Sequence, residues 1–118
     1  MMGRQIRPID LLERKMDHKK RTQTPEYQWE QALLDAYYDH RWRQVLEPLY
    51  QKFQQWKASE LDHMDMDEAI HQTHKQTQEV YVFFTQKRNL LVRVIQLDEP
   101  WFLTWVKDNP PPAGYPLG

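Results

Sequence analysis

The segment Glu68-Ala69-Ile70-His71-Gln72-Thr73-His74 spaces one carboxylate and two imidazoles three residues apart. On a helix, the Glu-x-x-His spacing puts both groups on one face, as the di-metal sites of ferritin-like bundles require. Iron, manganese or zinc would suit Glu68, His71 and His74 as ligands. Such a site also needs carboxylates from a facing helix, and the motif occurs once. The alternative interpretation is a solvated helix face, because His71 and His74 alternate with Gln72, Lys75, Gln76 and Gln78.

Other catalytic chemistry has little support in the composition. The 118 residues include no cysteine, which excludes a thiolate nucleophile, a disulfide framework and a cysteine-based zinc site. The three glycines, Gly3, Gly114 and Gly118, lie near the chain ends, so no glycine-rich phosphate loop is present. Asp39 and His40 are adjacent, and on a helix they point about 100° apart, which prevents a direct dyad. We therefore expect no enzymatic activity and no cofactor.

Residues 25–57 are predicted to form the first helical element, which would carry Asp39 and His40 and would face the helix that carries Glu68, His71 and His74. Thr24 is a suitable N-cap, and Pro25 suits the first helical position. Pro48 lacks an amide donor and its ring clashes with the preceding turn, so it predicts a kink or a break near Glu47. The segment is thus one bent helix or two short ones. Its predicted apolar face comprises Leu34, Tyr38, Trp42, Val45, Leu49 and Trp56, with Leu46 and Phe53 beside it.

A second long helix is predicted over 63–97, after a turn at 57–61 and with Asp62 as N-cap. Residues 79–97 are rich in strand formers, and a β-hairpin with its loop at 86–89 is the alternative. Helix is preferred because that loop lacks Gly and Pro. The core-facing stripe of this second helix has near-heptad spacing with a polar middle: Met66, Ile70, Thr73, Thr77, Val80, Phe84, Arg88, Leu91 and Ile95. Arg88 needs an acidic partner if it is buried on this stripe. In an antiparallel hairpin with its turn near residue 60, Asp35 is the acidic residue nearest to Arg88.

A short third helix is predicted to begin at Asp98, as N-cap, and to end before the prolines at 110–112. The predicted organisation is a basic N-terminal segment (1–24), a helical domain (25–108) and an extended proline-rich tail (109–118). The fold class is all-α: an antiparallel helical hairpin or bundle with a short C-terminal helix. An α+β fold with a hairpin at 79–97 is the alternative.

Charge is distributed unevenly along the chain. Residues 1–24 hold seven basic and three acidic residues, a net charge of +4, whereas the remaining residues carry −5. Such a segment could bind nucleic acid, but it has no aromatic residue and contains three acids. Its basic residues include Arg14, Lys15, Lys19, Lys20 and Arg21.

The segments at 80–84 and 90–95 are apolar nearly all round, so they need more than one neighbour. A symmetric homodimer forming a four-helix bundle is the simplest way to supply one, and a monomeric three- or four-helix bundle is the alternative. We expect a structural or protein–protein interaction module with an unknown protein partner. Its expected recognition residues are the basic segment together with Trp101, Phe102 and Trp105.

A metal-binding helical bundle and a nucleic-acid-associated protein are the alternative functions. No apolar run approaches the roughly 18 residues that a membrane span needs, and no signal peptide is recognisable. We therefore expect a cytoplasmic protein without membrane contact.

Overall fold

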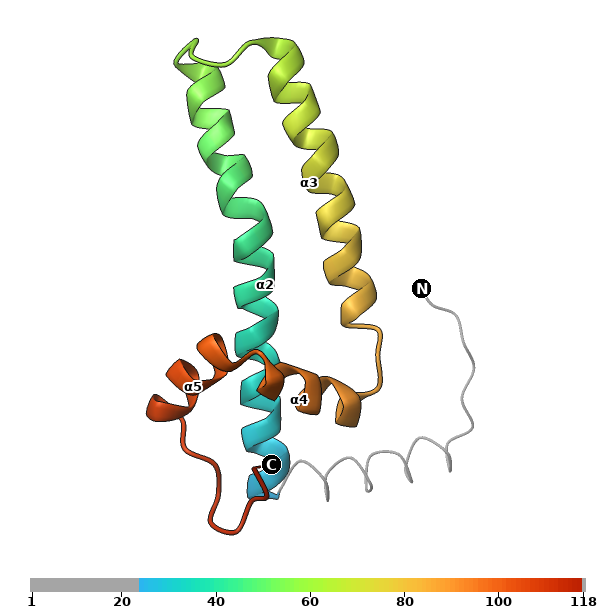
Figure 1. Ribbon diagram of the computed structural model, residues 1–118, viewed down its shortest axis with the longest axis vertical. Helices are drawn as coiled ribbons and strands as arrows, with labels where there is room; N and C mark the ends of the chain where they lie inside the picture. The colour runs from blue at the N-terminus through green and yellow to red at the C-terminus, as the bar shows by residue number, and fades with distance from the viewer. Residues whose placement is uncertain (1–23, 118) are drawn as a thin grey trace, which may run out of the picture.

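The computed structural model describes residues 24–117, which form four helices and no strand. The helices are α2 (Pro25–Lys57), α3 (His63–Phe83), α4 (Arg88–Leu97) and α5 (Glu99–Asp108). α2 and α3 form an antiparallel hairpin, and α4 and α5 lie across α2 at the end away from the tip (Figure 1). The predicted all-α fold is confirmed. The N-terminal basic segment lies outside the described residues, except for Thr24.

α2 begins as the sequence predicts and continues past its internal proline. The Thr24 hydroxyl oxygen accepts a hydrogen bond from the Tyr27 amide at 3.1 Å, and Pro25 occupies the first turn. Pro48 lies inside the helix, so of the two predicted alternatives the single helix is formed and the two short helices are not. Pro48 is exposed, whereas Val45 is buried and Leu49 is half-buried. Packing of these flanking residues holds the helix on both sides of the missing amide donor.

The turn between α2 and α3 forms at its predicted position. Ser59 has a φ of 64°, its amide donates to the Trp56 carbonyl at 3.0 Å, and the Glu60 amide donates to the Gln55 carbonyl at 2.8 Å. This pair of hydrogen bonds is a Schellman motif, which satisfies the last carbonyls of α2. The Asp62 side chain then accepts from the Asp65 amide at 2.7 Å and caps α3.

The prediction of one helix through residue 97 is wrong. α3 ends at Phe83 and α4 starts at Arg88, so the chain turns close to the place where the rejected hairpin had its loop. The turn packs Phe84 against Tyr38, with their ring centroids 5.0 Å apart. It also carries α4 across α2, where Val92 and Ile95 are buried. The predicted all-round apolar character of 90–95 is not observed, because Leu90 and Arg93 are exposed and Leu91, Val92 and Ile95 form one buried face.

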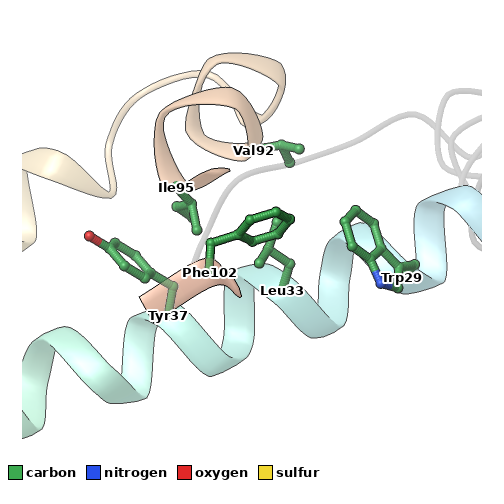
Figure 2. Packing of buried hydrophobic residues seen from close by; sticks show 6 residues of the cluster. All are labelled: Trp29, Leu33, Tyr37, Val92, Ile95 and Phe102. Atoms are coloured by element: carbon green, nitrogen blue, oxygen red, sulfur yellow. The ribbon is translucent and has the colours of Figure 1, made fainter. Parts of the chain in front are cut away.

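The core cluster lies where α2, α4 and α5 meet. Leu33 and Ile95 are fully buried there, and Phe102 packs from α5 (Figure 2). The predicted α2 face, through Leu34 and Tyr38, is displaced by one residue in this region. Leu33 and Tyr37 are buried instead, because α4 and α5 cover a different face of α2 from the one that α3 covers. The cluster comprises Trp29, Leu33, Tyr37, Val92, Ile95 and Phe102.

Candidate functional site

The predicted metal ligands lie on α3, and all three are exposed. The Glu68 carboxylate accepts a hydrogen bond from Gln72 at 2.7 Å, and a ring nitrogen of His74 lies 3.3 Å from the Gln78 amide nitrogen. Within residues 24–117, no group of three His, Cys, Asp or Glu side chains is placed to hold a metal ion. The structure therefore does not bring Glu68, His71 and His74 together with further ligands inside one chain.

The predicted aromatic recognition residues pack against the core cluster. Phe102 is buried, whereas Trp101 and Trp105 are half-buried. The Trp101 ring is nearly parallel to the Trp105 ring, with centroids 5.9 Å apart, and stacks on His40 with centroids 5.5 Å apart. These contacts join α5 to α2. Whether Trp101 and Trp105 also recognise a partner stays a prediction.

Two tyrosines donate hydrogen bonds that close this end of the molecule. The Tyr37 hydroxyl donates to Asp98 at 2.8 Å, so the Asp98 side chain does not cap α5 as predicted. Burial, and then the bond to Asp98, raises the pKa of Tyr37. The Tyr115 hydroxyl donates to the Glu30 carboxylate, and burial together with this contact raises the pKa of Tyr115 to about 12. The C-terminal tail is thereby attached to α2.

Arg88 begins α4 and binds α2, but not through the predicted ion pair. Its guanidinium donates to the Gln31 side chain at 2.6 Å and to the Tyr27 carbonyl at 3.0 Å. It also lies 3.8 Å from the Tyr27 ring centroid, in a cation–π contact. Asp35 is reached only indirectly, because the Gln31 amide donates to it at 2.8 Å. The break before α4 changes the register on which the ion-pair prediction depended.

The distal hairpin, which we define as residues 42–57 of α2 and 63–82 of α3, has a much thinner interior. Val45, Met66 and Val80 are its buried side chains. Large apolar side chains are exposed beside them: Leu46 is 43% exposed and Phe53 is 41% exposed. The full set of exposed apolar residues is Leu46, Tyr50, Phe53, Trp56, Met64, Ile70, Tyr81 and Val82.

Most of these exposed residues gather on one side of the distal hairpin. Successive residues of an α-helix are rotated by about 100°, so Trp42, Leu46 and Phe53 lie on a stripe next to the line that faces α3. Ile70 and Tyr81 are displaced in the same rotational sense from the α3 line through Met66 and Val80. In an antiparallel pair, equal displacements fall on the same side. We call this set the apolar side: Trp42, Leu46, Tyr50, Phe53, Ile70 and Tyr81.

The reverse of the hairpin is polar. Its exposed residues are Gln44, Gln51, Lys52, Gln55, Gln72 and Gln76. On the apolar side, a shallow groove of about 480 Å³ is lined by Trp42, Leu46 and Tyr50 together with three charged residues. Arg43 lies 2.9 Å from Asp39 and 3.7 Å from Glu47, so these charges pair along the groove's rim. The apolar centre and charged rim are the composition expected of a protein-binding surface.

The spacing of Trp42, Leu46 and Phe53 predicts that they belong to the core-facing stripe of the first helix. Their spacing correctly indicated an apolar face. Which part of that face α3 would cover could not be read from the spacing, because it depends on how the two helices are rotated about their axes.

Comparison with protein-family models, with curated proteins and with solved structures found no match to this chain. No helix in the part of the chain that the structure describes has both the length and the apolar character needed to cross a bilayer. The apolar side of the distal hairpin is therefore the candidate functional site, on geometry alone.

Proposed function

We propose that the chain is a homodimeric helical interaction module, in which the apolar sides of two distal hairpins pack into a four-helix bundle. The observation that supports this proposal is the uneven distribution of exposed large apolar residues: Leu46, Tyr50, Phe53, Ile70 and Tyr81 share one side of the distal hairpin, with polar residues such as His74 among them, whereas Gln44, Gln51, Gln55, Gln72 and Gln76 lie on the reverse. Contiguous exposed apolar surface on a small protein marks an interaction site. A second copy is the simplest partner, because a two-fold axis uses one patch twice and leaves none uncovered.

The proposal includes a cytoplasmic location. A chain without cysteine needs no disulfide bond and is therefore compatible with a reducing compartment.

Sedimentation velocity over a range of concentrations tests the homodimer. The Leu46→Glu variant places a charge in the middle of the apolar side, and we expect it to weaken dimerisation at least tenfold, since a buried unpaired charge is costly. The matched control is Gln44→Glu, which adds the same charge on the polar side and should dimerise like the native chain. Circular dichroism should show that both variants keep their helices.

A native chain that stays monomeric at high micromolar concentration would contradict the proposal. A monomer that dimerises only after residues 1–23 are deleted would also contradict it, because that segment would then be the occupant of the apolar side. Equal weakening by Leu46→Glu and Gln44→Glu would move the interface elsewhere.

A further inference from the structure

We infer that the two hairpins pair antiparallel, about a two-fold axis that crosses α2 at Pro48 and α3 near residue 72. This inference rests on the proposed homodimer and specifies how the second copy docks on the apolar side. It follows from three features: the register within the hairpin, the symmetry of the residues on each helix, and the distribution of charge along the hairpin.

The register within one hairpin is fixed by a contact at each end. At the tip, the Trp56 indole N–H donates to His63 Nδ1 at 2.9 Å. At the other end, the Tyr38 and Phe84 ring centroids are 5.0 Å apart. Proportional interpolation between these two contacts puts Pro48 level with about residue 72 of α3.

The apolar residues of α2 are arranged almost symmetrically about Pro48. Leu46 and Tyr50 are two residues before and after it, and Trp42 and Phe53 are six before and five after. In an antiparallel crossing at Pro48, Leu46 of one copy meets Tyr50 of the partner subunit. Trp42 likewise meets Phe53 of the partner subunit. Each large side chain of the stripe therefore faces an apolar partner.

The charges on the rim of α2 obey the same symmetry. Asp39 is nine residues before Pro48 and Lys57 is nine residues after it, and both are exposed. Eighteen residues make five full helical turns, so the two side chains leave the helix in the same direction. Asp39 would then lie beside Lys57 of the partner subunit, which forms two opposite-charge contacts per dimer.

Residues of α3 can also be paired across this centre. Ile70 and His74 are two residues either side of residue 72, and His63 and Tyr81 are nine residues either side. This centre is level with Pro48 on α2. A single two-fold axis perpendicular to the helices crosses both of them at one level, and the centres of the two stripes lie at one level.

Charge along the hairpin also opposes the parallel arrangement. The tip carries five acidic residues within nine positions: Glu60, Asp62, Asp65, Asp67 and Glu68. A parallel dimer would place two such tips side by side, where like charges repel. An antiparallel dimer instead places each tip near the partner's α3–α4 connection. Residues 80–97 contain no acidic residue and include the exposed Lys87 and Arg93.

Cross-linking of engineered cysteines tests the inference directly, because the native chain has none. The variants are Asp39→Cys, Lys57→Cys and the double variant, in the full chain, treated with a short bismaleimide. Sedimentation of each uncross-linked variant is the control that shows whether the dimer is present. Antiparallel pairing puts position 39 beside position 57 of the partner subunit, and separates the two copies of position 57 by about 27 Å along the bundle.

We expect the double variant to give covalent dimer at least tenfold faster than either single variant. A dimer in which Lys57→Cys alone cross-links efficiently would overturn the antiparallel pairing and leave the homodimer standing. A dimer in which the double variant gains nothing over the single variants would do the same. If the native chain is monomeric, both the inference and the proposed function fail.

Discussion

Two regions of the molecule differ in how completely they bury their apolar side chains. One is the end where α2, α4 and α5 meet, and the other is the distal hairpin. At the first, Leu33 and Ile95 are fully buried, and α5 and the tail cover them. In the distal hairpin, α2 and α3 bury one line of side chains and leave Leu46, Phe53 and Tyr81 in water. The first region is closed by α4, α5 and the tail, whereas the second has apolar surface that nothing else in residues 24–117 covers. This contrast in burial is the basis of the homodimer that we propose.

The largest expected effect separates the two regions by stability. Leu33→Ala should lower the free energy of unfolding by about 2–5 kcal/mol, because it removes fully buried methyl groups and leaves a cavity. Phe53→Ala, measured at concentrations where the chain is monomeric, should cost about 1 kcal/mol or less, since its ring is already partly in water. Urea denaturation followed by circular dichroism measures both. Similar losses for the two variants would remove the distinction between the regions.

Arg88 tests whether α4 is held to α2 by its polar contacts as well as by its apolar face. Arg88→Met should destabilise the protein by about 1–2 kcal/mol, because the hydrogen bonds to Gln31 and Tyr27 and the cation–π contact are lost. Arg93→Met is the matched control on the exposed face of the same helix, with an expected change below about 0.5 kcal/mol. The same denaturation experiment would contradict this account if the control lost as much.

The tail's attachment should be visible as a pH dependence. An unfolded tyrosine loses its proton near pH 10, whereas the pKa of Tyr115 in the folded chain is about 12. Its contribution to stability is therefore complete below pH 10 and is lost as the pH rises from 10 to 12. Tyr115→Phe should cost about 1 kcal/mol at pH 7, from loss of a partly exposed bond to Glu30.

Thermal unfolding at pH 8 to 12 measures the dependence on Tyr115. The native chain should lose more stability than Tyr115→Phe over the upper two pH units. Identical slopes for the two proteins would show that the hydrogen bond to Glu30 adds nothing.

The smallest predicted effect is a gain at the tip of the hairpin. Ser59 adopts a left-handed conformation that a side chain disfavours, so Ser59→Gly should stabilise the protein by about 0.5–1 kcal/mol. Differential scanning calorimetry should show a higher melting temperature. An unchanged or lower value would mean that the hairpin turn is indifferent to its backbone conformation.

Features set by neighbouring residues could be predicted from the sequence. The caps at Thr24 and Asp62 and the turn around Ser59 depend on local hydrogen bonds, and each formed at the predicted position. Features set by tertiary packing could not. The one-residue displacement to Leu33 and Tyr37 arises because two sets of helices cover two faces of α2. The break after Phe83 lets α4 cross α2 and bury Leu91, Val92 and Ile95, which depends on tertiary contacts.

The candidate site shows the same division. Trp42, Leu46 and Phe53 were recognisable as an apolar stripe, but their exposure depends on the rotation of α3. The spacing of Glu68, His71 and His74 likewise predicts that they lie on one helix, and all three lie on α3. Spacing along one helix cannot show whether a facing helix supplies further ligands, and within one described chain none are placed to do so.

The most direct test of the central claim is the mass of the native chain in solution, measured by light scattering during size-exclusion chromatography. The account predicts twice the monomer mass of 14.5 kDa, falling toward the monomer on dilution. It also predicts that Leu46→Glu elutes as a monomer at loads where Gln44→Glu remains dimeric. A native chain that has the monomer mass at every load, with Leu46→Glu indistinguishable from it, would contradict the claim that the distal hairpin is an association surface.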